Sequence, residues 1–271
     1  MDSYLNSEST RKFAAGIAYL GRGYIGWQTQ MKAPAKPSIQ EMVEEVFHSI
    51  LSEKTRVVAS GRTDAGVNAI EQVVHFRVHQ MKFTPEILVN AFNSRLPKDI
   101  RVLWVKQVSQ DFHAQRSAIK KQYSFFYLHG PVYLPEWQNR AVWMRHQLDV
   151  PKMHEAVQTL VGEHDFKVFQ ASGADPKKST VRTIFEADCT SLPLSEFPLF
   201  TRDDYCLTRI RLVGSGFLKQ MVRSIAGTLR EIGENKRPVT NFIDLMQSQN
   251  RQALGTTAQP DGLWLERVWY P

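Results

Sequence analysis

The sequence predicts an α+β fold in two halves, residues 1–112 and 113–271, with a cleft where the two antiparallel sheets meet. Two observations support this prediction. The chain has 271 residues, of which 42% are hydrophobic, and this is enough for a sizeable core. Strand-like and helix-like patterns are mixed along both halves, with no low-complexity tract and no short repeat.

The first half has the element order strand, helix, strand, strand, helix, strand, which is the split βαβ arrangement of ferredoxin-like domains. Ser38 and Glu41 have the spacing of a capping box, so the first helix is expected to begin there. Pro85 is expected at the start of the second helix. The expected elements are a strand over 13–20, a helix from Ser38, strands over 55–60 and 72–78, a helix over 85–96 and a strand over 100–108.

The second half repeats this mixture less regularly, so the two halves are interpreted as coarse duplicates around residue 112. Its longest helix is expected over 216–233, where Arg223 shares a polar stripe with Lys219 and Arg230. The other expected elements are a strand over 119–130, a helix over 151–162, paired strands over 181–189 and 205–213, a helix over 239–248 and a strand over 262–270.

The composition indicates a basic protein with many aromatic residues. The formal net charge is +7, the isoelectric point is near 9.4, and the charge is spread over the whole length. Such a surface is typical of a protein that binds a polyanion, in particular a nucleic acid. The net charge alone also allows an alternative, in which the surface carries a few extra lysines and binds no nucleic acid.

Cysteine usage and hydropathy favour a cytoplasmic protein. Only Cys189 and Cys206 occur, without the spacing of a zinc site, and we expect both to be reduced thiols. The N-terminal segment has no apolar signal region, and no stretch approaches the length of a membrane span. We therefore expect neither a metal nor a membrane anchor.

The segment GRGYIG matches the glycine pattern of a dinucleotide-binding turn at Gly21, Gly23 and Gly26. Such a turn must lead directly into a helix, whose N-terminus binds the pyrophosphate. Here two prolines and a polar segment come before the next helix. We therefore interpret the glycines as a turn that displays Tyr24, Trp27 and Gln28, and a dehydrogenase remains the weakest alternative.

The segment GRTDAGV places Asp64 between Gly61 and Gly66, with Arg62 two residues before it. Glycines on both sides permit positive φ angles, so the backbone can turn sharply and present the central residues. Composition alone favours an ordinary turn aspartate that bonds to its own backbone. The alternative is that the loop exposes the Asp64 carboxylate so that it can react with a substrate.

The same segment resembles the signature of the TruA family of tRNA pseudouridine synthases, and further motifs extend the resemblance over nearly the whole chain. Several motifs in the right order are far more specific than any single one. They are GRTDAGVNA at 61–69, YIGWQ at 24–28, PSIQE at 37–41, VHF at 74–76, RLPKDIRV at 95–102, DFHAQRSAIKKQYSFFY at 111–127, GEHDF at 162–166, GFLKQMVRSIAG at 216–227 and DGLWL at 261–265.

The resemblance implies both a fold and a set of site residues. The fold is two ferredoxin-like halves with a central basic cleft. Asp64 corresponds to the catalytic carboxylate and Arg223 to the arginine that pairs with it. Arg62 corresponds to the arginine that holds the everted nucleotide or fills its place in the stack, and Tyr123 to the tyrosine that stacks on the target base. Without the resemblance, Arg223 would be interpreted as one of several solvent-exposed charges along a helix. Tyr123 would be interpreted as a half-buried residue of a strand.

Two departures from the family pattern affect RNA contacts rather than the catalytic set. The family loop usually reads GVHA, whereas this chain has Asn68 in place of the histidine. The segment after GEHDF keeps Arg182 and Thr183 but has its own loop. Candidates for phosphate contacts are Lys120, Lys121, Lys177, Lys178, Arg209 and Arg211.

The resemblance therefore predicts an isomerase that converts uridine to pseudouridine in the anticodon stem-loop of tRNA, at tRNA sites 38 to 40. It implies no metal, no organic cofactor and a homodimer. One alternative is a relative that modifies other RNA uridines. The other is a catalytically idle RNA-binding protein, which the presence of Asp64 disfavours.

Overall fold

The computed structural model describes residues 10–30, 35–79, 83–173, 179–194 and 204–271. The chain divides into two compact units. The first unit contains the residues up to 65, residues 69–119 and residues 268–271, and the second contains residues 66–68 and 120–267. Both units combine a sheet with helices, so the predicted α+β class is confirmed.

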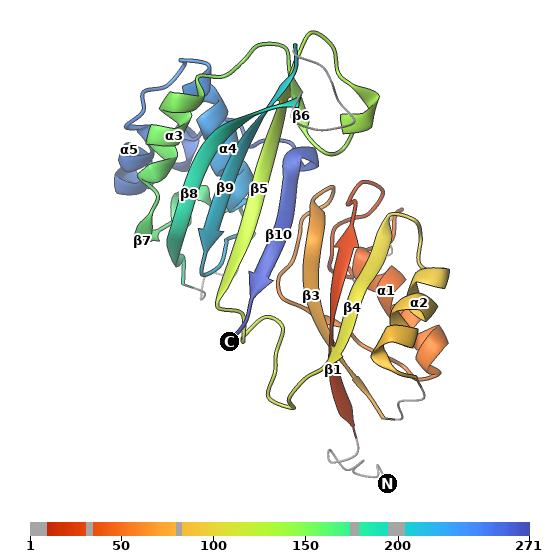
Figure 1. Ribbon diagram of the computed structural model, residues 1–271. Coiled ribbons are helices and arrows are strands. Elements are labelled where there is room, and N and C mark those ends of the chain that lie inside the picture. The colour runs from red at the N-terminus through yellow and green to blue at the C-terminus, as the bar shows by residue number, and fades with distance from the viewer. Residues whose placement is uncertain (1–9, 31–34, 80–82, 174–178, 195–203) are drawn as a thin grey trace. The chain divides into compact units, whose positions relative to one another are not determined.

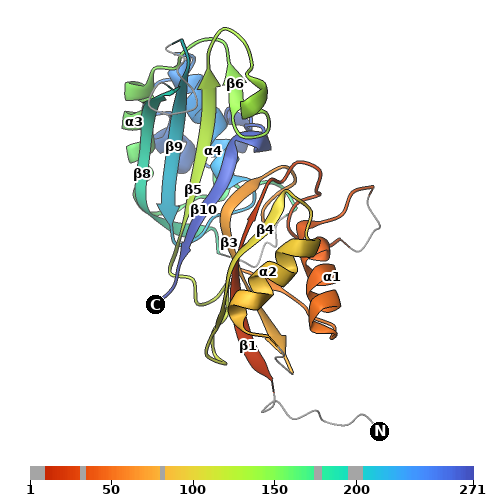
Figure 2. The same cartoon turned by 45° about the vertical axis from the view of Figure 1, so that its right-hand side comes forward.

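The first unit has an antiparallel sheet in the order β4-β1-β3, with the short β2 paired to Val74 and His75 of β3. Both of its described helices, α1 and α2, lie on the same face of that sheet (Figure 2). The elements are β1 (Arg11–Tyr19), α1 (Ile39–Leu51), β2 (Val58–Ala59), β3 (Asn68–Val78), α2 (Pro85–Arg95) and β4 (Ile100–Gln107).

Aromatic rings fill the core between this sheet and its two helices. Phe47 of α1 stacks on Phe92 of α2 with 3.8 Å between ring centroids, and its edge meets Phe76 of β3 at 5.0 Å. The predicted capping box is present: the Ser38 hydroxyl accepts from the N–H of Glu41, whose carboxylate accepts from the N–H of Ser38. The start of α1 is therefore fixed by its sequence.

The second unit has a sheet in the order β10-β5-β9-β8-β7, with β6 parallel to β5. Helices α3, α4 and α5 lie on one face of this sheet (Figure 1). The elements are β5 (Lys120–His129), β6 (Val142–Met144), α3 (Val150–Gln158), β7 (Gly162–Asp165), β8 (Val181–Pro193), β9 (Cys206–Gly214), α4 (Met221–Gly233), α5 (Asn241–Ser248) and β10 (Leu263–Trp269).

Helix α4 differs from the expected helix over 216–233, because it begins at Met221. The preceding residue, Gln220, has a left-handed backbone with φ of 59°, which cannot continue an α-helix. Helix α4 therefore has 13 residues and shares the greatest length among the described helices with α1. Lys219 lies outside α4, so the predicted polar stripe keeps Arg223 and Arg230 but not Lys219.

Among the described residues, none of the helices combines the length and the apolar character that crossing a bilayer requires. Both cysteines are free thiols, Cys189 buried and Cys206 partly exposed. Burial raises the pKa of the Cys189 thiol to about 12. Cys189 is therefore protonated at neutral pH and unreactive as a nucleophile.

The sheet face of the first unit opposite to its helices is partly covered by residues 109–117. Lys12 of β1 donates from Nζ to the carbonyl oxygens of Gln110 and Phe112, both at 2.6 Å. The N–H of Ala114 donates to Nδ1 of His75, at 3.1 Å. This imidazole is 8% exposed and lies 4.8 Å from the ring of His113.

The buried imidazole of His75 is expected to make the folded protein less stable in acid. Burial, assisted by the charges of His113, Lys12, Arg77 and Arg116, lowers its pKa from 6.5 to about 4. Between these two values the unfolded chain binds the proton and the folded chain does not. The free energy of unfolding therefore decreases as the pH falls from 6.5 to 4, by on the order of 2 kcal/mol from this group.

Urea titrations at several pH values measure this effect. His75→Asn keeps an acceptor for Ala114 but does not titrate, and its stability is expected to depend less on pH in that window. An unchanged slope in His75→Asn would contradict the assignment.

Candidate active site

The loop that contains Asp64 connects β2 to β3 and is fixed at its start by buried hydrogen bonds. The N–H of Ser60 donates to the carbonyl oxygen of Val73, at 2.8 Å. The amide of Gln72, which has no solvent exposure, donates to the carbonyl oxygen of Gly61 at 2.8 Å. A buried amide in this position ties the loop to β3, because losing the bond would leave its polar atoms unsatisfied.

Thr63 anchors the middle of the loop to β1 and to the glycine-rich turn. Its hydroxyl lies 2.8 Å from the hydroxyl of Tyr19, and its carbonyl oxygen accepts from the N–H of Trp27 at 3.0 Å. Burial raises the pKa of Tyr19 to about 12, so this phenol stays protonated and able to donate. The residue directly before Asp64 is therefore held at both its side chain and its main chain.

Gly26 forms an antiparallel β-bridge with Asp64. Its φ is +102°, and a Cβ at this position would lie 2.6 Å from the carbonyl oxygen of Thr63. Any other residue would push the loop away. The interpretation of this turn as displaying Trp27 is wrong, because Trp27 is 1% exposed and packs beside Tyr19.

The first backbone donors of α1 also bind this turn. The N–H of Ile39 donates to the carbonyl oxygen of Gly26 at 3.1 Å, and the N–H of Gln40 donates to that of Trp27 at 3.0 Å. In a dinucleotide site these helix donors face a phosphate. Here they connect α1 to the turn that supports the Asp64 loop.

The loop leaves the side chains at its tip accessible. Arg62 is exposed and Asp64 is partly exposed, while Thr63 between them is buried. Gly66 has a φ of +80°, as predicted for a sharp turn, but Gly61 is not among the glycines with positive φ. One glycine, rather than two, supplies the left-handed turn beside Asp64.

Tyr123 lies on β5 in the second unit and is 7% exposed. Its ring meets that of Phe217 edge to face, with 5.1 Å between centroids. Phe125 and Tyr127 follow it on the same face of the strand and are fully buried, as their alternation predicts. Phe217 was not predicted as a neighbour of Tyr123, although it is the second residue of the motif GFLKQM.

Arg223 lies in the first turn of α4, also in the second unit. Its Nε donates to the carbonyl oxygen of Ala258 at 2.8 Å, and its own carbonyl oxygen accepts from the N–H of Ala258 at 3.1 Å. Arg223 is partly exposed, which agrees with the prediction that it lies outside the main core. The bond from Nε orients the guanidinium group, and the main-chain bond ties the first turn of α4 to Ala258.

Asn68, the departure from the family loop, is fully buried in the second unit. Its side-chain amide donates to the carbonyl oxygens of Asn139 at 2.9 Å and Asp261 at 3.1 Å. Asn68 therefore has a structural role that joins three segments of the chain.

Replacing Asn68 by alanine is expected to lower the free energy of unfolding by about 2 kcal/mol, because two partly buried carbonyl groups lose their donor. Urea denaturation measures the change. Asn90→Ala, which removes an amide from an exposed position of α2, is the control and should change stability far less. Equal stabilities of Asn68→Ala and wild type would show that the two bonds contribute nothing.

The candidate phosphate contacts differ in their surroundings. Arg211 is paired with Asp188 at 2.6 Å and with Glu186 at 2.8 Å, so two carboxylates already neutralise it. Burial and the neighbouring Arg182 lower the pKa of Lys121 to about 8. Lys177 and Lys178 lie outside the described residues.

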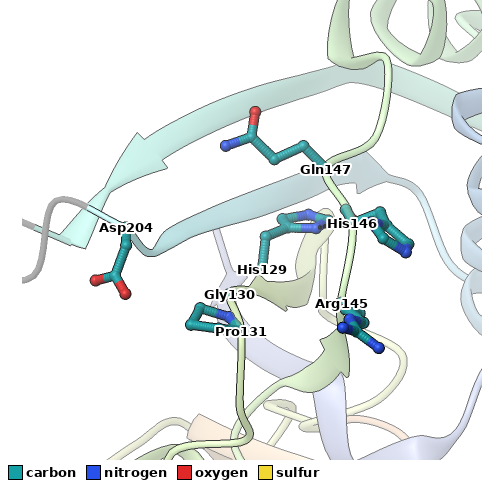
Figure 3. Close-up of a pocket in the computed structure, with 7 residues that line it drawn as sticks. All are labelled: His129, Gly130, Pro131, Arg145, His146, Gln147 and Asp204. Atoms are coloured by element: carbon teal, nitrogen blue, oxygen red, sulfur yellow. Dashed lines mark hydrogen bonds between the residues drawn. The ribbon is translucent and has the colours of Figure 1, made fainter.

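A pocket of about 280 Å³ lies in the second unit, and none of the residues predicted above lines it (Figure 3). His129 forms part of its wall and is 2% exposed, with Nδ1 2.8 Å from the carbonyl oxygen of His146 and Nε2 2.8 Å from the hydroxyl of Thr208. Both ring nitrogens therefore serve the fold. No cluster of three or more potential metal ligands occurs among the residues that the structure describes.

Comparison with known proteins identifies the family. A family model described as tRNA pseudouridine synthase matches residues 15–115 and 156–271. The tRNA pseudouridine synthase A of Hydrogenovibrio crunogenus is 35% identical over 95% of this chain and 92% of its own length. The chain belongs to the TruA family of tRNA pseudouridine synthases. As a TruA-type protein, it is an isomerase that converts uridine to pseudouridine in tRNA.

Other TruA relatives match over similar lengths. The protein of the same name from Nitrosomonas eutropha is 37% identical over 94% of this chain and 86% of its own length. That from Neisseria gonorrhoeae is 35% identical over 98% and 95%, respectively. Among solved structures, the archaeal box H/ACA sRNP Nop10-Cbf5 complex matches with a TM-score of 0.34 and 11% identity, covering 89% of this chain and 59% of that chain. No conclusion rests on a similarity this weak.

Proposed function

We propose that this TruA-type enzyme isomerises uridines 38 to 40 in the anticodon stem-loop of tRNA, with Asp64 as the catalytic carboxylate. The observation that carries the proposal is the way the GRTDAGV loop is held. Thr63 and the Gly26 bridge fix the main chain at Asp64, while the Asp64 side chain stays accessible. Catalysis benefits from a reacting group that is positioned before the substrate arrives.

The reaction is an isomerisation. The bond from C1′ of ribose to N1 of uracil breaks, a bond from C1′ to C5 forms, C5 loses a proton and N1 gains one. Atoms and electrons balance without an oxidant, so the proposal needs neither an organic cofactor nor a metal. Asp64 acts either by attacking C1′ or by taking a proton from the sugar to give a glycal.

The roles of the other site residues follow from this chemistry. A carboxylate in a dry pocket tends to be protonated unless a cation opposes it, and we assign that task to Arg223. Tyr123 stacks on the target base, and Arg62 holds the everted nucleotide. The bonds from Arg223 to Ala258 and the exposure of Arg62 support these roles.

The proposal extends to the fold and the assembly. The sheet order β4-β1-β3-β2 of the first unit supports two ferredoxin-like halves, divided at residue 112, with a basic cleft that binds tRNA. We propose a cytoplasmic homodimer, in keeping with the family and with the free thiols. The alternative is that this member of the family modifies other RNA uridines. Only two departures from the family sequence favour it: Asn68 in place of histidine and the loop after GEHDF.

Incubation with an unmodified tRNA transcript tests the activity. Nucleosides from the digested RNA are separated chromatographically, and a pseudouridine peak is expected with no added metal or cofactor. An unstructured RNA of equal uridine content serves as the control substrate. Tight tRNA binding without any pseudouridine would instead favour the idle RNA-binding protein. Binding is also expected to weaken steeply with salt, because several phosphates must be neutralised.

A further inference from the structure

The helix-free face of the first unit's sheet carries an aromatic side chain among small residues. Gly16 of β1 pairs with Trp104 of β4, and Ala14 pairs with Lys106, so these four residues share one face. Residues 109–117 cover the end of that face near Lys12.

The indole of Trp104 lies on the backbone of Gly16. A Cβ at Gly16 would lie 2.3 Å from the indole nitrogen and 2.6 Å from the adjoining ring carbon, so only glycine allows this contact. The ring is nevertheless partly exposed, and the ammonium of Lys106 lies 5.3 Å from its centroid. Gly16 supports one face of the ring and the Lys106 ammonium lies over it, so a base can stack on the indole when this flexible side chain turns to a phosphate.

The charges on this face favour an anionic partner. Lys106 and Arg116 are exposed, Arg77 is exposed on the neighbouring strand β3, and Lys12 pairs with Arg77 in the register. Asp111 is an acidic neighbour of Lys12. Three exposed cations, Lys106, Arg77 and Arg116, near a partly exposed aromatic ring match single-stranded RNA better than another protein surface.

We propose that Trp104 and Lys106 form a second RNA-contact site, in which Trp104 stacks on an unpaired nucleotide of the substrate and Lys106 binds a neighbouring phosphate. This inference rests on the proposed function, because it takes tRNA as the ligand. Gly16 lies three residues before Tyr19, which contacts Thr63 of the Asp64 loop. The site thus lies roughly 10 Å along β1 from Tyr19, on the opposite face of the strand.

Filter binding with unmodified tRNA and single-turnover pseudouridine formation test this site. Trp104→Ala is expected to weaken tRNA binding about tenfold, and Trp104→Phe, which keeps a ring, much less. Lys106→Ala should weaken binding about threefold and reduce the salt slope by about one. Lys236→Ala removes an equally exposed charge from the second unit and is the control, with wild-type binding expected.

The outcomes separate this inference from the function on which it rests. A wild-type protein that makes no pseudouridine overturns the proposed function. A wild type that is active, with Trp104→Ala, Trp104→Phe and Lys106→Ala all binding tRNA as it does, overturns the second site alone. Circular dichroism confirms folding, and Lys106→Ala keeps the test decisive if Trp104→Ala unfolds. Variants that change the oligomeric state by light scattering but not tRNA affinity would assign the face to protein contacts instead.

Discussion

An Asp64→Asn variant is expected to form pseudouridine about 10⁴-fold more slowly than wild type while binding tRNA with similar affinity. Asparagine preserves the shape of the side chain, so the main-chain bridge to Gly26 and the bonds of Thr63 should persist. It supplies neither a nucleophilic oxygen anion nor a base. Single-turnover assays with saturating enzyme measure the chemical step, and filter binding measures affinity.

Asp244→Asn is the matched control for this prediction. Asp244 is exposed on α5 in the second unit, and the same replacement there should leave the rate of pseudouridine formation unchanged. If Asp64→Asn retained more than about a tenth of the wild-type rate, another group would have to supply the carboxylate chemistry.

A Gly227→Ala variant is expected to lose about 3 kcal/mol of stability, although alanine normally favours a helix. A Cβ at Gly227 would lie 1.8 Å from the carbonyl oxygen of Thr256. The displaced segment also contains Ala258, which bonds twice to Arg223. We therefore expect pseudouridine formation to fall about a hundredfold in the fraction that remains folded, since a shift of about 1 Å misplaces Arg223.

Thermal or urea unfolding and single-turnover rates measure the two effects of Gly227→Ala separately. Gly216→Ala is the control for stability, because a Cβ there meets Arg182 only at 3.6 Å, an ordinary contact distance. A Gly227→Ala protein as stable as wild type would mean that the segment around Thr256 moves freely and does not position Arg223.

Strong local patterns predicted most elements of the fold. The capping box at Ser38 and the proline at position 85 marked helix starts that the structure confirms. Paired strands around 181–189 and 205–213 are confirmed as β8 and β9. These signals depend on neighbours in the sequence, so a sequence reading can recover them.

Features that depend on distant residues were not recovered. Helix α4 starts later than its apolar pattern suggests, because Gln220 takes a left-handed conformation that no propensity forecasts. The short strands β6 and β7 have three and four residues, too few for an alternation to be visible. The burial of Trp27 follows from its contact with Tyr19, which lies on β1.

The candidate site also combines features that the sequence predicts with features that depend on distant residues. The motif GRTDAGV indicated the loop and Asp64, yet the residues that hold the loop in place, Tyr19 and Gln72, carry no local signal. Asn68 was read only as a missing histidine, whereas its two bonds to distant carbonyl groups give it a structural role. Such contacts require the folded chain.

The most direct test of the central claim is the position of pseudouridine in a tRNA transcript after incubation with the wild-type protein. Carbodiimide labelling followed by primer extension locates each pseudouridine to a single nucleotide. We expect stops at uridines 38, 39 and 40 where the transcript carries them, no stop at other uridines, and none with Asp64→Asn. Stops confined to other uridines, or stops that persist in Asp64→Asn, would contradict the account.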